Sequence, residues 1–232
     1  PPSPILSGLV GSEMCIRDRS NSDSPNFHDA NTNESVVVSL PDPAGAKNMV
    51  ITFGYFDAGN DWWWAIDNLM VFEAYTVGSV EGFDGLVLGP NVDEELAGDA
   101  VWTKTAPGGW SIDDSGVPGV GIPDQDGVTE WAGWSFADKD WWAQATGDQR
   151  RSEFTKATGT IAIADGDEWD DQDHAEGYLN TFMSWPVTIS GAAEGSLELH
   201  FDSSWRPEYD SNYHQTANIT VSYDGADPVE VM

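Results

Sequence analysis

Three consecutive tryptophans, Trp62 to Trp64, are the feature that most restricts how this chain can fold. They begin an apolar run, WWWAIDNLMVF, which extends to Phe72 and has the length of a β-strand. Side chains alternate between the two faces of a strand, so Trp62 and Trp64 must point away from Trp63. Because large apolar groups then occupy both faces, we expect this strand to be covered on both sides.

The rest of the 232 residues has the composition of an all-β protein. Twelve Trp, nine Phe and six Tyr accompany 24 Gly and 13 Pro, which favours short aromatic strands joined by turns. Only residues 137–159 are compatible with helix, in two short pieces interrupted near Gly147. Further strands are predicted at residues 34–40, 49–56, 81–88, 160–165, 177–189, 196–205 and 217–225. We therefore predict an all-β fold, a jelly-roll β-sandwich with short helices only in loops.

The chain is strongly acidic. Nine Lys and Arg against 40 Asp and Glu give a formal net charge of -31 at pH 7. This field repels polyanions, which excludes nucleic acid as a partner and opposes binding to anionic membranes. No apolar run approaches the length needed for membrane insertion. The simplest interpretation is a solvated acidic surface suited to salty surroundings, with cation binding as a local addition.

The N-terminal segment differs from the rest. GSEMCIRDR, residues 11–19, resembles the translation of a sequencing adaptor. We therefore expect residues 1–19, with the only cysteine, Cys15, to be a disordered artefact and the true N-terminus to be missing. A signal peptide would not be observable in that case. A chain without disulfides fits the cytoplasm or a secreted bacterial protein braced by metal ions.

Five short segments resemble jelly-roll modules of the MAM type and their bacterial relatives, the choice-of-anchor J type. WAIDNLMVF, residues 64–72, is similar to the last strand of such a module, and EGFDG, residues 81–85, is similar to its first strand. APGGW, GYLNTFMSWPVTISG and LELHFDSSW, which begin at residues 106, 177 and 197, resemble elements in between. The cysteines usual in animal MAM modules are absent here, which favours the bacterial relatives.

The resemblance implies two partial modules. Residues 20–75 would be the C-terminal part of a first module, and residues 76–232 the N-terminal and central part of a second one. The strand ending the first could fill the vacant place in the second, as in a circular permutant, and would then pair with residues after 81. MAM-like modules hold a calcium between a first-strand Glu and a closing-strand Asp. Glu81 and Asp67 match those positions.

A second candidate calcium site follows from the residues themselves. The segment ADGDEWDDQDH, residues 164–174, is dense in carboxylates, and Ca²⁺ takes six to eight oxygen ligands. Its spacing is not that of an EF-hand, and a solvated acidic loop is the alternative. The candidate ligands are Asp165, Asp167, Asp170, Asp171 and Asp173. We expect Ca²⁺, if bound, to have a structural role.

A candidate ligand-binding segment is SSWRPEYDSNYHQ, residues 203–215, which we predict to be a loop. Sugar rings stack on aromatic faces, while Arg, Asp and Asn side chains bind their hydroxyls. The alternative is that the aromatic rings fix the loop on the sandwich. The candidate residues are Trp205, Arg206, Tyr209, Tyr213 and His214.

Other chemistry is weakly indicated. No two carboxylates are marked as a catalytic pair, because 40 acidic residues meet by chance. His200 and Asp202 share a strand face and could ligate zinc, but no third ligand is indicated. Arg150 and Arg151, two of the few basic residues, are expected to pair with local carboxylates.

These patterns favour a noncatalytic extracellular recognition or adhesion module. It would bind carbohydrate or another cell-surface ligand, be stabilised by Ca²⁺, and belong to a larger secreted bacterial protein with further domains. Two alternatives stay open. One is an accessory domain of a secreted hydrolase, a glycanase or a phosphoesterase, whose catalytic domain lies elsewhere. The other is a purely structural spacer.

Overall fold

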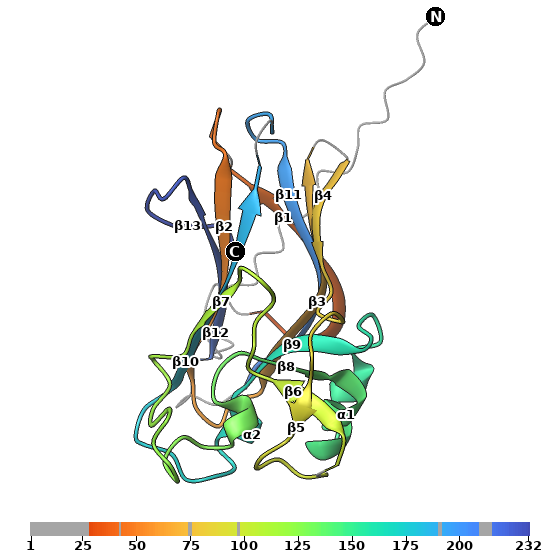
Figure 1. The fold of residues 1–232 in the computed structure, drawn as a ribbon, viewed down its shortest axis with the longest axis vertical. Coiled ribbons are helices and arrows are strands. Elements are labelled where there is room, and N and C mark those ends of the chain that lie inside the picture. The colour runs from red at the N-terminus through yellow and green to blue at the C-terminus, as the bar shows by residue number, and fades with distance from the viewer. Residues whose placement is uncertain (1–27, 42, 74–75, 97, 190–191, 209–214) are drawn as a thin grey trace, which may run out of the picture.

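A computed structural model describes residues 28–41, 43–73, 76–96, 98–189, 192–208 and 215–232. The expectations for residues 1–19 and for Tyr209, Tyr213 and His214 lie outside the described residues. The described chain forms two antiparallel sheets, and its helices are short (Figure 1). The predicted all-β sandwich is therefore confirmed.

The larger sheet has eight strands in the order β1-β11-β3-β9-β8-β6-β5, with β4 also paired to β3. Its long strands are β1 (Asn31–Leu40), β3 (Trp63–Glu73) and β11 (Leu197–Arg206). Its short strands are β4 (Thr76–Glu81), β5 (Gly89–Pro90), β6 (Ala100–Thr103), β8 (Ser135–Asp138) and β9 (Thr160–Asp165).

The smaller sheet has five strands in the order β13-β12-β2-β10-β7. They are β2 (Asn48–Ala58), β7 (Ser111–Asp113), β10 (Leu179–Thr188), β12 (Thr216–Tyr223) and β13 (Val229–Glu230). Buried and more exposed residues alternate along β10 and β12, as expected where one face packs on the core and the other meets solvent.

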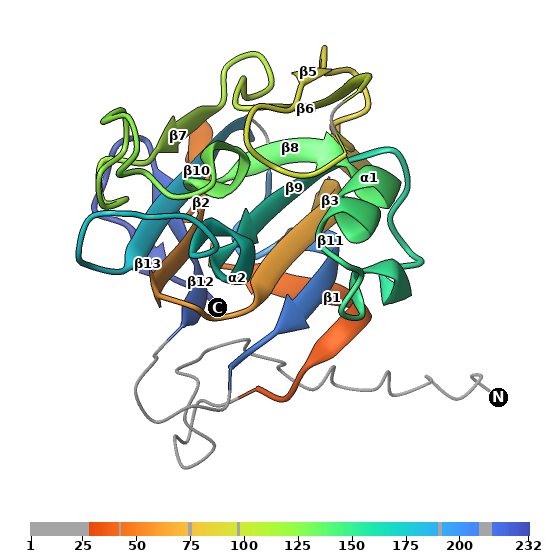
Figure 2. The same ribbon diagram turned by 90° about the horizontal axis from the view of Figure 1, so that it is seen from below.

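Short helical segments lie at one end of the sandwich, where they cover part of the larger sheet (Figure 2). They are α1 (Lys139–Ala145), α2 (Gly166–Trp169) and the 3₁₀ turns η1 (Thr129–Trp131) and η2 (Arg151–Glu153). The carboxylate of Asp138 caps α1 by accepting a hydrogen bond from the Trp141 amide. The predicted interruption near Gly147 is confirmed, because left-handed residues separate α1 from η2.

Strand β3 joins the early and late parts of the chain. Trp64 lies opposite Trp205 of β11 on one side and opposite Ala164 of β9 on the other, and Leu69 lies opposite Glu81 of β4. The pairing expected between this strand and the later segment is therefore present. The origin of the chain from two modules stays a prediction.

The core between the sheets is aromatic. The ring centroids of Trp64 and Trp134 are 5.4 Å apart, and Phe53 lies 6.0 Å from both Trp64 and Phe201. On the opposite face of β3, Trp63 packs edge-on against Trp142 of α1, with centroids 5.7 Å apart. Both faces of this strand are covered, as the tryptophan run predicted, and the cover on the second face comes from α1 and η2.

Two predictions around residue 81 differ from the structure. Residues 76–81, which were not predicted as a strand, form β4, and the predicted strand at 81–88 is irregular after Glu81. Phe83 there has a φ of 55° and buries its ring against Phe136. Residues 203–205 were included both in a predicted strand, 196–205, and in a predicted loop, 203–215. The strand prediction is correct there, because β11 continues to Arg206.

Candidate functional site

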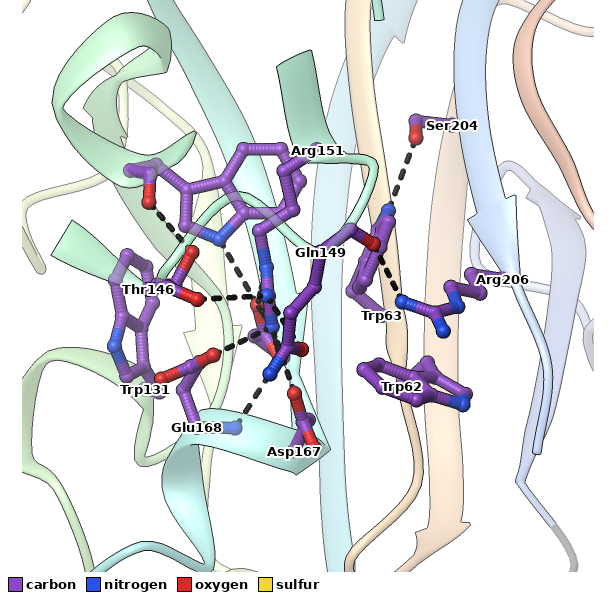
Figure 3. Close-up of polar contacts among 12 residues, drawn as sticks. Trp62, Trp63, Trp131, Thr146, Gln149, Arg151, Asp167, Glu168, Ser204 and Arg206 are labelled. Atoms are coloured by element: carbon purple, nitrogen blue, oxygen red, sulfur yellow. Dashed lines mark hydrogen bonds and ion pairs between the residues drawn. The ribbon is translucent and has the colours of Figure 1, made fainter. Parts of the chain in front are cut away.

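Arg151 is the centre of a buried cluster at the helical end of the sandwich (Figure 3). Its Nε donates to Asp165 Oδ2 at 3.0 Å and its Nη2 to Asp165 Oδ1 at 3.1 Å, a bidentate pair. Nη2 also lies 3.1 Å from Asp167 Oδ2 and 2.8 Å from Glu168 Oε1. We call Arg151 with these carboxylates and the surrounding rings of Trp63 and Trp142 the tryptophan–arginine cluster. The expected pairing of Arg151 with local carboxylates is confirmed.

Local sequence brings these groups together. Asp165 ends β9 and caps α2, accepting a hydrogen bond from the amide of Glu168, so the first turn of α2 presents three carboxylates in one place. Arg151 follows three left-handed residues, 148–150, which turn the chain back toward β9. The guanidinium lies 4.4 Å from the ring centroid of Trp63, and the indole N–H of Trp142 donates to Asp165.

The cluster holds more negative than positive charge. Burial, followed by the charge of Asp165, raises the pKa of Asp167 to about 6 and that of Glu168 to about 9. One guanidinium does not neutralise the charge of three carboxylates, of which Asp165 and Glu168 are buried and Asp167 is partly exposed, and the excess negative charge adds to the rise in the pKa of Glu168. A protonated carboxyl can act as an acid, but the Glu168 side chain is only 7% exposed. This burial favours a structural role.

Trp62 carries the second arginine contact of this region. The guanidinium of Arg206 lies 3.1 Å from the Trp62 ring centroid, and the Trp62 ring meets Trp63 edge-on at 5.8 Å. Arg206 also donates to the backbone oxygen of Gln149 at 2.5 Å. Trp62 and Arg206 are both partly exposed, so their stack closes the cluster at the surface.

The predicted calcium ligands of residues 165–173 are dispersed. Asp165 and Asp167 bind Arg151, and Asp170 accepts from His174 Nε2 at 2.5 Å. Asp171 is an exposed residue, and partial desolvation of its carboxylate, followed by the charge of Asp170, raises its pKa. Asp173 lines a hollow of about 440 Å³, whose other acidic lining residues are Asp93, Asp124 and Asp126.

The two calcium ligands implied by the resemblance are neighbours on paired strands. Asp67 lies on β3, and Glu81 ends β4 opposite Leu69. The Asp67 carboxylate is buried and accepts from the amides of Asn68 and Thr158. Burial raises its pKa to about 7, and the charges of Asp84 and Asp202 add to this rise.

Neither the calcium sites nor the zinc site predicted from the sequence forms a complete set of metal ligands among the described residues. Among the residues that the structure describes, no three His, Cys, Asp or Glu side chains form a group that could hold a metal ion. The suggested zinc pair is divided: His200 Nε2 contacts Glu198 at 2.9 Å, whereas Asp202 accepts from Ser35 and Asn68.

The predicted ligand-binding residues are also separated. Trp205 is fully buried, because it lies on the inward side of β11, and its indole N–H donates to the backbone oxygen of His28. It cannot offer a ring face to a ligand in this conformation. Arg206 is partly exposed on Trp62. The other three candidates fall outside the described residues.

A surface that the sequence reasoning missed lies on the outer side of the smaller sheet. Apart from the exposed Asp57 near the end of β2, the outward side chains of its three central strands carry no charge, although the whole chain has 40 acidic residues. We call this surface the neutral face. On β2 it comprises Asn48, Val50, Thr52, Gly54 and Phe56; on β10, Asn180, Phe182, Ser184, Pro186 and Thr188; on β12, Thr216, Asn218, Thr220 and Ser222.

Strand register orders this face into rows. Thr220 lies opposite Thr52, Thr52 opposite Ser184, and Ser184 opposite Ser111 of β7. A row of four hydroxyl residues therefore crosses four strands, and within it Thr52 Oγ1 and Ser184 Oγ are hydrogen-bonded at 2.9 Å. We call Ser111, Ser184, Thr52 and Thr220 the hydroxyl row.

The next row contains an aromatic platform. Phe182 is 36% exposed and lies opposite Gly54 of β2 on one side and opposite the exposed Asp113 of β7 on the other. Asn218 lies beyond Gly54, and its Nδ2 donates to Glu230 Oε2 at 3.2 Å. The ring of Phe56 is nearly parallel to that of Phe182, at 24° with centroids 6.1 Å apart. A Cβ on Gly54 would lie 2.4 Å from Asn218 Oδ1 and 3.0 Å from the Phe182 ring, so glycine lets these side chains close over the strand.

A second hollow lies on the other sheet. It has a volume of about 450 Å³ and is lined by Phe72, Glu198 and His200 among others, with the Phe72 and His200 ring centroids 4.3 Å apart. Neither this hollow nor the acidic one includes a member of the tryptophan–arginine cluster.

Comparison of the chain with models of protein families, with curated proteins and with solved structures finds no match. Within the described residues, no helix has the length and apolar character needed to cross a membrane.

Proposed function

We propose that this protein is a noncatalytic recognition module that binds carbohydrate on the neutral face. The observation that carries the proposal is a surface of hydroxyl, amide and phenyl groups with carboxylates only at its margins, Asp57, Asp113 and Glu230, on a chain of net charge -31. Sugars present hydroxyls to polar side chains and apolar C–H faces to aromatic rings, and the rows of this face offer both kinds of contact side by side.

Its composition favours sugar over a protein partner. The cores of stable protein interfaces are predominantly apolar, whereas most side chains of the neutral face are hydroxyls or amides. A second copy of this chain would also carry a net charge of -31, and the two fields would repel each other. A purely structural spacer would have no need of an exposed Phe182 beside an uncharged row.

Absence of catalysis is part of the proposal. The carboxyl group with the most strongly raised pKa, Glu168, is buried against Arg151 and away from the neutral face. We propose that the module acts outside the cell, within a larger secreted bacterial protein related to the MAM-like or choice-of-anchor J jelly rolls. An accessory role beside a hydrolase domain is compatible with the same binding site.

A structural Ca²⁺ beside Asp67 and Glu81 belongs to the same proposal. Support comes from the burial of the Asp67 carboxylate and from the nearby charges of Asp84 and Asp202, since a cation there would offset their mutual repulsion. Ca²⁺ should then raise the melting temperature of the wild type and leave Asp67→Asn nearly unchanged. An equal response of both proteins to Ca²⁺ and to a chelator would remove Asp67 from the site.

The glycan site is tested with Phe182→Ala. Calorimetric titration with neutral soluble polysaccharides, a glucan, a mannan and a xylan, should detect binding to the wild type. Loss of the exposed ring should weaken it about tenfold, since an aromatic contact contributes about 1 kcal/mol beyond its area and burial adds to this.

The matched control is Phe72→Ala, which removes a partly exposed ring from the outer face of the other sheet. It should leave the affinity unchanged. Weakened binding in Phe72→Ala but not in Phe182→Ala would move the site to the hollow around His200. Absence of binding to every polymer by the wild type would contradict the proposed function.

A further inference from the structure

We infer that the neutral face takes internal segments of an extended, uncharged polysaccharide, and that the chain lies across the strands along the hydroxyl row. This inference rests on the proposed function. It adds the class of ligand, the direction in which the polysaccharide crosses the strands, and the residues at each end of the hydroxyl row. It follows from the register of four neighbouring strands.

The hydroxyl row gives a repeating array. Ser111, Ser184, Thr52 and Thr220 lie on successive strands, and neighbouring strands are about 4.8 Å apart. That spacing is comparable to the length of one sugar residue in an extended chain. Consecutive sugars can therefore each meet one hydroxyl, while Phe182 and Asn218 contact the same chain from the adjacent row.

The two ends of the row are open. Ser111 is exposed on β7, the last strand at one edge of the sheet. At the other edge Thr220 is followed by the exposed Glu230 of β13. β7 and β13 are the two edge strands of this sheet, and Ser111 and Glu230 are exposed on them. A polymer can therefore extend beyond the row at both edges of the sheet. A site for chain ends would need a wall at one side.

Charge selects the ligand. The four side chains of the row are uncharged, but two exposed carboxylates lie beside them. Asp113 of β7 lies opposite Phe182, and Glu230 of β13 lies opposite Thr220 and accepts a hydrogen bond from Asn218. They repel uronates and sulfates, and the net charge of -31 adds a long-range field of the same sign. Neutral sugars are not repelled and can donate hydroxyl protons to these carboxylates.

The experiment is a chain-length series. Affinities are measured by calorimetry for neutral β-1,4-linked gluco-, manno- and xylo-oligosaccharides from disaccharide to hexasaccharide, together with the matching polymers and polygalacturonate. We expect affinity for one neutral series to rise up to the tetrasaccharide and then level off, with no binding of polygalacturonate. Reduction of the terminal sugar should not change the affinity of the hexasaccharide.

Two variants test the direction. Ser111→Ala and Thr220→Val remove hydroxyls at opposite ends of the row, and each should weaken hexasaccharide binding about three- to tenfold, the value of one hydrogen bond. Disaccharide binding, centred on Phe182, should change less. Ser39→Ala, which removes an exposed hydroxyl from β1 on the other sheet, is the control and should have no effect.

The outcomes separate the two proposals. If polymers bind and Phe182→Ala weakens them, but Ser111→Ala and Thr220→Val do not alter the dependence on chain length, the direction along the row is wrong and the function stands. A marked effect of reducing the terminal sugar would overturn the internal-segment inference. If no carbohydrate binds, the proposed function itself fails.

Discussion

At the residue scale, the clearest case of a side chain fixed by its surroundings is Arg151. It is fully buried, with three carboxylates on its guanidinium and the Trp63 ring against it. Burying a charge is costly unless it is paired, and Arg151 is paired with three carboxyl groups. Arg150, the preceding residue, is half-exposed and forms a surface ion pair with Glu153.

Arg151→Met should therefore destabilise the fold strongly. Its removal leaves buried carboxylates without their partner, and we expect the free energy of unfolding to fall by about 3–5 kcal/mol. Arg150→Met, the matched control, should cost less than about 1 kcal/mol. Urea denaturation followed by tryptophan fluorescence measures both values. Equal losses in the two variants would show that the buried network is not stabilising.

Glu168 should make the stability depend on pH. Its pKa is raised from 4.5 to about 9 in the folded protein, so between these values the folded state binds a proton that the unfolded state has released. Stability from this group therefore falls as pH rises from about 5 to 9.

Glu168→Gln mimics the protonated form and keeps an acceptor oxygen for Arg151. Its melting temperature should fall less than that of the wild type over this range. Asp227→Asn, in the exposed segment between β12 and β13, controls for the loss of one negative charge. Identical pH profiles for Glu168→Gln and wild type would contradict the shifted pKa.

At the scale of elements, β2 shows how one glycine shapes the candidate site. Gly54 is the only residue of its row without a side chain, and Asn218 and Phe182 close over it. In Gly54→Val the new side chain would displace the side chains of both Asn218 and Phe182. We expect loss of glycan binding with a small change in stability, because the displaced side chains lie at the surface. Calorimetric titration and thermal melting measure the two effects, and unchanged affinity would argue against a role for this row.

The strands themselves could be predicted in large part. The apolar run from Trp62 to Phe72 and the segment at residues 160–165 correspond closely to β3 and β9. Alternation and turn residues are local signals, so they are visible in a single sequence. Strand β4, Thr76 to Glu81, was missed because most of its residues are exposed and it pairs with only one strand, β3.

The neutral face could not be predicted, because it depends on register between distant strands. Thr52, Ser184 and Thr220 are far apart in sequence, and only their pairing makes them a row. The same limit explains the acidic segment at residues 164–174. Its carboxylates suggested calcium, but Asp165 and Asp167 face Arg151, whose position depends on the fold of η2.

At the scale of the whole molecule, the early and late parts of the chain are interleaved. β2 lies between β12 and β10, and β3 lies between β11 and β9. A protein limited to residues 76–232 would lack β1 and β3 of the larger sheet and β2, the middle strand of the smaller sheet.

We therefore expect residues 76–232 alone to show no cooperative thermal transition by circular dichroism. Addition of residues 28–75 as a separate chain should restore it, because the missing strands supply hydrogen-bond partners to both sheets. A cooperative transition of 76–232 alone would show that this segment forms an independent module.

The most direct test of the account is a titration of the isotopically labelled protein with a neutral hexasaccharide, followed by amide chemical shifts. We predict that the largest shifts fall on β2, β10 and β12, centred on Thr52, Phe182 and Thr220. Shifts concentrated instead around Trp62 and Arg206, or around Phe72 and His200, would contradict binding on the neutral face.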